Sequence, residues 1–222
     1  MNITFVLNFL RELQQNNSKA WMDAHRSEYL QAKSFFREFV EQLLAQLKTI
    51  DPALHATTAN DSIFRINKND FSKKGEAPYK GHFAAGISPG GRHSAFANYV
   101  FVLEPGNKSR VGGGIRQPAP ALLALLRQEI DYSPGELEAI LAAPAFKSQF
   151  GTLQGQQRKS APKGYAKSHP AIALLRYNGF QALHFFTDEE VQQPDFIYQL
   201  LPLYRQLMPL HHFLNRVITN EA

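Results

Sequence analysis

The sequence contains no cysteine and only one tryptophan among its 222 residues. The absence of cysteine excludes disulfides, thiolate nucleophiles and cysteine-ligated metals, and it agrees with a reducing compartment. No apolar run reaches the ~18 residues that a membrane-spanning helix needs. The N-terminal apolar run has no basic leader, and Arg11 and Glu12 interrupt it early. We therefore expect a cytoplasmic protein with no membrane partner.

Signature motifs of several enzyme classes are also absent. The chain has no G-x-S-x-G elbow, no G-x-x-x-x-G-K-[ST] loop, no H-E-x-x-H and no paired acidic metal motif. Hydrolase and kinase functions therefore have no positive support. His25 and Glu28 share one helical face, but no second group of ligands accompanies them, so we assign no metal site and no cofactor. The patterns predict no particular oligomeric state.

The chain does have the apolar content of a packed protein, since 44% of its residues are hydrophobic and 12% are aromatic. A chain of this length buries roughly 70% of its unfolded surface, which is enough for one substantial core without disulfides or metals. No internal repeat or long linker divides it. We therefore predict a single domain over residues 1–222.

Positive charge is concentrated in two blocks, although the net charge is only +5. Residues 61–116 hold nine basic and four acidic side chains, and residues 139–187 hold six basic and no acidic ones. Residues 1–60 sum to zero, while 117–138 and 188–222 contribute −3 each. Such concentration creates local fields that attract anions. The alternative is a solvated basic surface that aids solubility.

Hydrophobic periodicity predicts an α+β fold, with a helical region 1–51, a sheet region 62–116 and a mainly helical region 117–222. A 3.6-residue rhythm from Ser18 to Ile50 predicts a long helix that either has a kink near residues 26–28 or spans the whole domain. The C-terminal region, from about 194 to 217, is also helical in pattern. We expect Pro202 and Pro209 to interrupt it.

Four extended runs predict an antiparallel sheet of four or five strands in the central region, at 62–67, 79–87, 95–103 and 108–115. A further strand is predicted at Phe180–Phe186. In the first run, alternation places Phe64 and Ile66 toward the core and Arg65 and Asn67 on the opposite face. The glycines at 112–114 are typical of a hairpin end or bulge, and the alternative is a phosphate cradle.

Several segments carry a resemblance to a known family. They read FLRELQQNNSKAWMDAHRSEY, FRINKNDFSKK with PYKGHF, YVFVLEPG with GGGI, and RKSAPKGYAKSHPAIALLRY. In this order and spacing the chain resembles the conserved family called domain of unknown function 2461, over nearly its whole length. The resemblance implies a single α+β domain and no established activity. The family pattern usually has arginine before Phe-Ser-Lys, whereas this chain has Asp70, so Lys68 or Lys74 is the nearest substitute.

The basic residues and their neutral neighbours form the predicted anion-binding face. Arginine presents a planar fork that matches phosphate or carboxylate oxygens, and lysine is a mobile point charge. The expected ligand is a phosphate-bearing anion such as a nucleotide, a nucleic acid or a phosphorylated metabolite. The predicted ligand-binding residues are Arg65, Asn67, Lys68, Lys73, Lys74, Tyr79, Lys80, Arg92, Arg116, Lys159 and Lys163.

Three alternatives stay open at this point. Arg65 and Lys80 can instead form internal ion pairs with Glu104, Asp61 or Asp70. The protein can also be an enzyme on an anionic substrate, with His82 and Glu104 as its proton-transfer groups. The third alternative is a scaffold that docks a partner through the leucines of its C-terminal helix, at 200, 203, 207 and 210.

Overall fold

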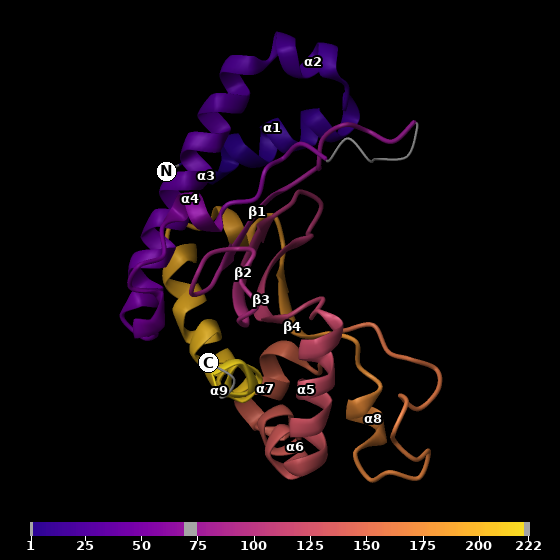
Figure 1. The fold of residues 1–222 in the computed structure, drawn as a ribbon. Coiled ribbons are helices and arrows are strands. Elements are labelled where there is room, and N and C mark those ends of the chain that lie inside the picture. Colours follow the sequence, from indigo (N-terminus) through magenta and orange to yellow (C-terminus); the bar gives the residue numbers. More distant parts are fainter. Residues whose placement is uncertain (1, 69–74, 220–222) are drawn as a thin grey trace. The chain divides into compact units, whose positions relative to one another are not determined.

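The computed structural model describes residues 2–68 and 75–219. Within them lie nine α-helices and one antiparallel sheet of four strands in the order β1-β2-β3-β4, which confirms the predicted α+β class (Figure 1). The strands are β1 (Phe83–Ile87), β2 (Asn98–Leu103), β3 (Ser109–Ile115) and β4 (Phe180–Phe186). The helices are α1 (Ile3–Gln15), α2 (Lys19–Ala24), α3 (Arg26–Lys48), α4 (Ala59–Ser62), α5 (Pro120–Tyr132), α6 (Pro134–Ala142), α7 (Pro144–Phe150), α8 (Ile172–Leu175) and α9 (Phe196–Thr219).

The chain divides into two compact units. The first unit comprises Met1–His93, Val100–Val111 and Phe185–Leu201, and the second comprises Ser94–Tyr99, Gly112–His184 and Pro202–Ala222. The predicted assignment of one domain to residues 1–222 stays a prediction. No helix among the described residues is both long and apolar enough to span a membrane.

A row of aromatic rings forms the core of the first unit, where α1 lies against α3 (Figure 1). The rings of Phe36 and Phe83 lie 5.2 Å apart between centroids, and those of Phe39 and Phe101 lie 4.6 Å apart. Such pairs contribute about 0.5–1.5 kcal/mol each beyond the burial of their area. Helix and sheet are therefore joined by ring contacts.

The predicted long helix after Ser18 breaks at His25, next to the expected kink. The side chain of Ser18 caps α2 by accepting a hydrogen bond from the backbone N–H of Trp21. The ring of His25 stacks on Trp21 at 4.2 Å between centroids, and its Nδ1 lies 2.9 Å from the carbonyl oxygen of Trp21. These contacts give His25 a structural role at the junction of α2 and α3.

The prediction of a strand from Ser62 is wrong in its first residue, because Ser62 ends the short helix α4. Thr58 and Asp61 form a reciprocal capping box that fixes this helix. Residues 63–68 are extended and pair with 78–85 through antiparallel bridges, although they form no named strand. The predicted facing is confirmed for Ile66, which is buried, and for Arg65 and Asn67, which are exposed, whereas Phe64 is half-buried.

In the second unit, the three glycines at 112–114 let β3 approach its neighbours closely. A Cβ on Gly112 or Gly114 would collide with backbone carbonyls of β4, and one on Gly113 would overlap the ring of His211. Gly114 also has a φ of +119°, a backbone conformation that would be strained for any residue other than glycine. Close packing of buried backbone therefore accounts for these glycines, which lie within β3 and not at a hairpin end.

Helix α9 continues through Pro202 and Pro209, so the predicted interruptions are wrong. Each proline removes one helical hydrogen bond, to the carbonyl of Tyr198 or Arg205. Both prolines and both of those residues are exposed, so water can reach the freed carbonyls. The opposite face of α9 buries its leucines at 200, 203, 207 and 210, and this burial stabilises the helix. The leucines proposed to dock a partner thus lie inside the chain's own core.

Candidate anion-binding site

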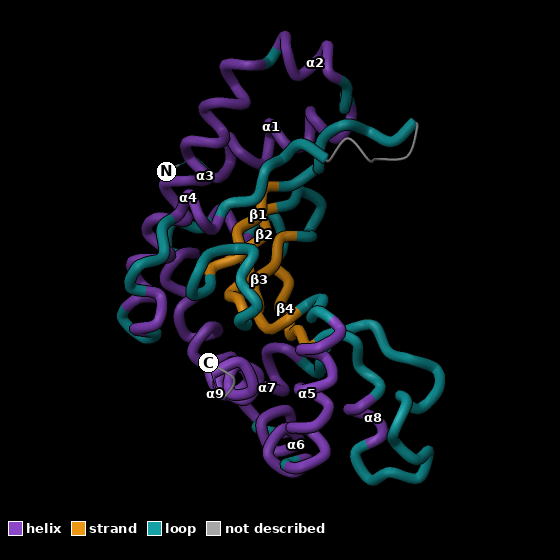
Figure 2. The backbone as a smooth tube through the Cα atoms, viewed as in Figure 1, coloured by secondary structure: helices purple, strands orange, loops and turns teal. Residues whose placement is uncertain are grey.

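Two short extended segments of the second unit pair next to α8, where Figure 2 shows long loops around a short helix. Gln157 and Tyr177 form an antiparallel bridge. On either side of it, the N–H of Arg158 donates to the carbonyl of Arg176 and the N–H of Asn178 donates to the carbonyl of Gln156, both at 2.8 Å. Because side chains alternate along extended backbone, those of Gln156 and Arg158 share one face of this ribbon, and Asn178 lies opposite Gln156. Arg176 has helical backbone angles at the end of α8, so this alternation does not extend to it.

Arg127 of α5 binds the same ribbon. Its Nε donates to the carbonyl of Leu175 at 3.0 Å, and its Nη2 donates to the carbonyl of Tyr177 at 3.2 Å and to Oδ1 of Asn178 at 3.0 Å. Burial lowers the pKa of Arg127, and the nearby positive charge of Arg158 lowers it further. Arg127 therefore lies close to a second positive charge, that of Arg158.

We call Arg127, Arg158 and Arg176 the arginine cluster, because Arg127 lies near Arg158 and both bind the backbone around Arg176. No carboxylate of the described residues makes an ion pair with any of the three. Nε of Arg176 is buried and has no hydrogen-bond partner in the described part of the chain. Like charges opposite each other across paired strands are destabilising, and a buried unpaired donor costs about 1–3 kcal/mol. An anion bound beside Arg127 and Arg158 would relieve the repulsion between like charges.

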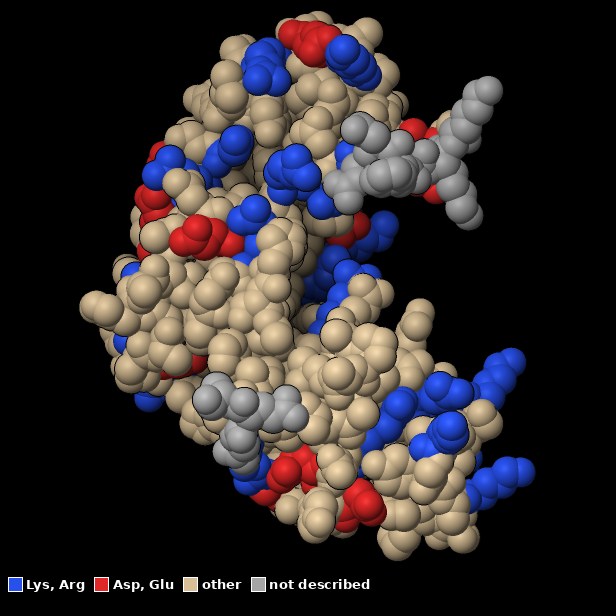
Figure 3. Space-filling view, in the orientation of Figure 1, with Lys and Arg blue, Asp and Glu red and all other residues tan. Residues whose placement is uncertain are grey.

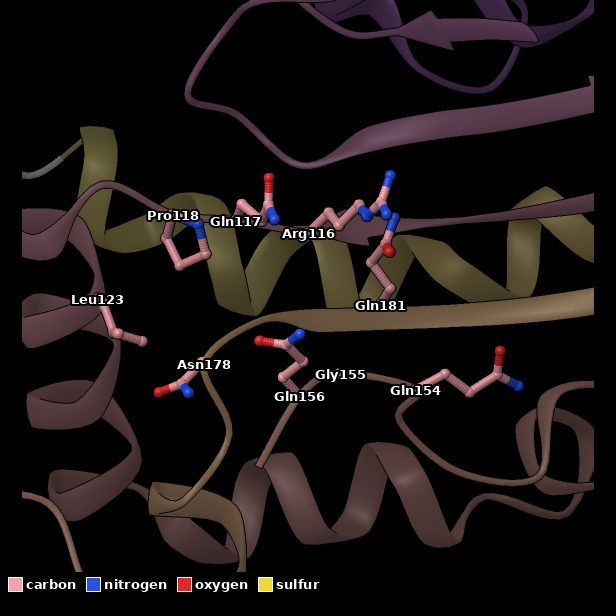
Figure 4. Close-up of a pocket in the computed structure, with 9 residues that line it drawn as sticks. All are labelled: Arg116, Gln117, Pro118, Leu123, Gln154, Gly155, Gln156, Asn178 and Gln181. Carbon is pink, nitrogen blue, oxygen red and sulfur yellow. The ribbon is translucent and has the colours of Figure 1, made fainter. Parts of the chain in front are cut away.

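A pocket of about 370 Å³ adjoins the ribbon (Figure 4). Its walls come from the end of β3, the start of α5, the segment 154–156 and β4. Side-chain amides dominate the lining, which consists of Arg116, Gln117, Pro118, Leu123, Gln154, Gly155, Gln156, Asn178 and Gln181. Arg116 and Gln181 point toward one another in Figure 4. Gln156 and Asn178 belong both to this lining and to the arginine-bearing face of the ribbon.

Several side-chain amides in the pocket have no hydrogen-bond partner among the described residues. Among the described residues, the side-chain amides of Gln117, Gln156 and Gln181 make no hydrogen bond, whereas Gln154 donates to the carbonyl of Leu183 at 3.1 Å. Arg116 is exposed and forms no ion pair with any described carboxylate. The pocket therefore offers one cation and several neutral groups that can each donate and accept hydrogen bonds.

Asp131, Tyr165 and His169 lie beside the cluster. Nε2 of His169 is 2.8 Å from Oδ1 of Asp131, and Nδ1 of His169 accepts the N–H of Ala171 at 3.1 Å. Both ring nitrogens are thus engaged. Burial raises the pKa of Tyr165, the charge of Asp131 raises it further, and Arg127 opposes the shift. The Asp131 carboxylate, which lies beside the cluster, is thus bonded to a histidine.

In the first unit the structure brings together two of the predicted cations. Nζ of Lys80 donates to the backbone carbonyl of Arg65 at 2.8 Å and lies 5.9 Å from the ring centroid of Phe64. Burial lowers the pKa of Lys80, and the charge of Arg65 lowers it further. No described carboxylate pairs with either residue. The alternative of an ion pair to Glu104 or Asp61 therefore finds no support, and Asp70, the third carboxylate of that alternative, lies outside the described residues.

The two residues predicted to transfer protons, His82 and Glu104, lie close together, but Glu104 also forms an ion pair with an arginine. Nδ1 of His82 lies 3.9 Å from Oε2 of Glu104, and the same oxygen accepts a 2.8 Å bond from Nη1 of Arg110. Asp61 bonds instead to the hydroxyl of Thr58. Glu104 thus neutralises Arg110, and catalysis by His82 and Glu104 stays a prediction.

Other predicted ligand residues of the first unit have structural partners. Nη1 of Arg92 donates to the carbonyls of Asn60 and Asp61 at the end of α4, at 3.0 and 2.9 Å. Tyr79 is buried, and the side-chain amide of Asn17 binds its backbone N–H and carbonyl. The structure therefore gives Arg92 and Tyr79 roles in holding the chain.

Some of the remaining predicted ligand-binding residues are described by the structure and others are not. Asn67 forms a bridge to Tyr79 and has an exposed side chain, and Lys68 is half-buried. Lys73 and Lys74 lie outside the described residues. Lys159 and Lys163 are exposed on the loop before α8, a part of the surface where Figure 3 shows basic side chains gathered and acidic ones sparse.

Sequence reasoning found Arg116, Lys159 and Lys163 but missed the arginine cluster. The absence of acidic residues from 139 to 187 pointed to this region in general terms. Arg127 gave no signal, because it lies in an acidic segment and reaches the ribbon only through the fold. The pocket glutamines gave none either, since isolated amides are common on surfaces.

Comparison with known proteins identifies the family. The model of the family described as conserved hypothetical protein (DUF2461) matches residues 5–213, so the chain belongs to this family. No curated protein and no solved structure matches the chain.

Proposed function

We propose that this member of the DUF2461 family binds a small phosphate-bearing ligand in its second unit, with the arginine cluster holding the phosphate. The observation that carries the proposal is the proximity of Arg127 and Arg158, which both bind the backbone of residues 175–177, with no carboxylate of the described residues ion-paired to Arg127, Arg158 or Arg176. Guanidinium groups bind phosphate oxygens in a bidentate fashion, so a phosphate suits the N–H groups of the cluster that have no protein acceptor.

A small ligand suits the site better than a nucleic acid. The cluster adjoins a pocket of about 370 Å³, which is within the ~300–1,000 Å³ typical of small-molecule sites. Nucleic-acid surfaces instead follow the backbone with a longer basic groove and stacking aromatic rings. No aromatic side chain lines this pocket among the described residues.

Calorimetric titration with inorganic phosphate and pyrophosphate tests the proposal. We expect saturable binding that weakens as salt rises, because the exposed charges are screened. Arg158→Gln removes an exposed member of the cluster and is expected to weaken binding about tenfold or more. Arg205→Gln is the matched control, since Arg205 is an exposed arginine of α9 in the same unit.

The absence of any phosphate or pyrophosphate binding at low salt would reject the proposal. Equal weakening by Arg158→Gln and Arg205→Gln would assign the effect to net charge rather than to the cluster. Binding of labelled RNA without binding of small phosphorylated compounds would replace the proposed ligand by a nucleic acid.

A further inference from the structure

We infer that the ligand is a phosphorylated sugar or polyol, whose phosphate binds the arginine cluster and whose hydroxyl groups enter the amide-lined pocket. This inference rests on the proposed function and adds the chemistry of the part of the ligand that carries no phosphate.

The cluster and the pocket form one continuous surface through Gln156 and Asn178. Both residues line the pocket, and both lie on the face of the ribbon that carries Arg158. Asn178 also accepts a hydrogen bond from Arg127. A ligand bound by its phosphate at the arginines therefore has the pocket beside it.

The lining is suited to hydroxyl groups. A hydroxyl donates one hydrogen bond and accepts others, and a side-chain amide can satisfy both roles with one group. Gln117, Gln156 and Gln181 have such amides without a partner among the described residues. Each further hydroxyl that binds an amide adds affinity and orientation.

The same lining is poorly suited to a nucleobase. A base is usually held by an aromatic or apolar face against its ring, and the described lining has no aromatic residue. Its apolar side chains are Pro118 and Leu123, at one end of the pocket in Figure 4. A hydroxyl-rich ligand therefore matches this surface better than a nucleotide.

The walls of the pocket are made rigid by close backbone contacts. A Cβ on Gly155 would collide with the carbonyl of Gly179, and a Cβ on Gly179 would collide with the carbonyl of Arg116. The segments that carry Gln154, Gln156, Asn178 and Arg116 thus lie directly against one another. Such preformed walls fix the backbone from which these side chains extend before a ligand arrives, which reduces part of the entropic cost of binding.

Calorimetry with five probes tests the inference: inorganic phosphate, glucose 6-phosphate, ribose 5-phosphate, adenosine monophosphate and glucose. We expect at least one sugar phosphate to bind about tenfold or more tightly than inorganic phosphate, because one or two added amide bonds suffice for that factor. Adenosine monophosphate should bind no better than ribose 5-phosphate. Glucose alone should bind more weakly than glucose 6-phosphate.

Variants assign the two parts of the ligand. Gln156→Ala should weaken binding of the preferred sugar phosphate about tenfold and leave that of inorganic phosphate unchanged. Gln157→Ala is the matched control, because Gln157 is an exposed neighbour whose side chain lies on the other face of the ribbon. Arg158→Gln should weaken the binding of both the sugar phosphate and inorganic phosphate.

The outcomes separate the two proposals. Sugar phosphates that bind no better than inorganic phosphate, or adenosine monophosphate that binds more tightly than both sugar phosphates, would overturn the inference and leave phosphate binding intact. A Gln156→Ala variant that binds sugar phosphates normally would also overturn it. Failure of every phosphorylated probe to bind would reject phosphate binding itself.

Discussion

The buried histidine of α9 predicts a specific dependence of stability on pH. His211 is 2% exposed, and its Nε2 has no hydrogen-bond partner among the described residues. The ring of Tyr99 lies 4.4 Å from it between centroids, and the backbone of Gly113 packs against its edge. Burial lowers the pKa of His211 from 6.5 to about 3, with a smaller contribution from His212. The folded protein therefore keeps this ring neutral.

The sign follows from the two states. Below about pH 6.5 the unfolded chain binds a proton at position 211 and the folded chain does not, so protons favour unfolding. The contribution of His211 is fully present above pH 6.5 and is lost as pH falls toward about 3. At about 1.4 kcal/mol per pH unit, roughly 3 kcal/mol of unfolding free energy disappears between pH 6.5 and 4.5.

Urea unfolding followed by circular dichroism between pH 7 and 4.5 measures this loss. The variant His211→Leu removes the titrating ring, so its unfolding free energy should fall by about 3 kcal/mol less than that of the wild type over this interval. His55→Gln serves as the control, because His55 is exposed, and it should keep the wild-type slope. An identical slope in wild type and His211→Leu would refute the reasoning.

Two further predictions concern stability. Asp188 accepts hydrogen bonds from the N–H groups of Gly106 and Asn107 and from Arg11; although burial raises its pKa, these bonds lower it below the ordinary value. Asp188→Asn should therefore cost about 2 kcal/mol in urea unfolding at pH 7, and the difference should shrink as the wild-type carboxylate is protonated below about pH 3.8; a constant difference would contradict this account. Gly113→Ala should lower the unfolding free energy by about 2 kcal/mol or more, because its Cβ would overlap the buried ring at 211. Gly135→Ala serves as the control, because a Cβ at this position meets nothing within 4 Å, and it should leave the unfolding free energy unchanged or raise it. Equal changes in thermal stability for the two alanine variants would contradict the steric explanation.

The elements that the sequence predicts well are those whose pattern is decided locally. The strand at Phe180–Phe186 was predicted with the bounds that the structure has, because its residues are strongly apolar and Gly179 precedes them. Helix α9 was predicted as broken, because proline in a helix interior is unfavourable by about 3 kcal/mol. Only the fold shows that Pro202 and Pro209 both face water.

The site was harder to predict than the fold, because its parts come together only in three dimensions. Charge counting identified the second basic block, and Arg116 was selected by residue type. The grouping of Arg127 with Arg158 depends on a helix that meets a ribbon some 30 residues later in the chain. Likewise, the carboxylate proposed for Arg65 was that of Glu104, which instead binds Arg110, its neighbour across the β2–β3 turn.

The most direct test of anion binding by the arginine cluster is the Nε–H signal of Arg176 in a nitrogen-15 NMR titration. This group is buried and has no hydrogen-bond partner among the described residues, and Arg176 binds Arg158 through its backbone, so we expect a phosphate bound at the cluster to change the surroundings of this group. Saturating glucose 6-phosphate or inorganic phosphate should shift this signal along a binding curve and slow the exchange of its proton with water. An Arg176 signal that stays in place while phosphate binds elsewhere on the protein would contradict the account.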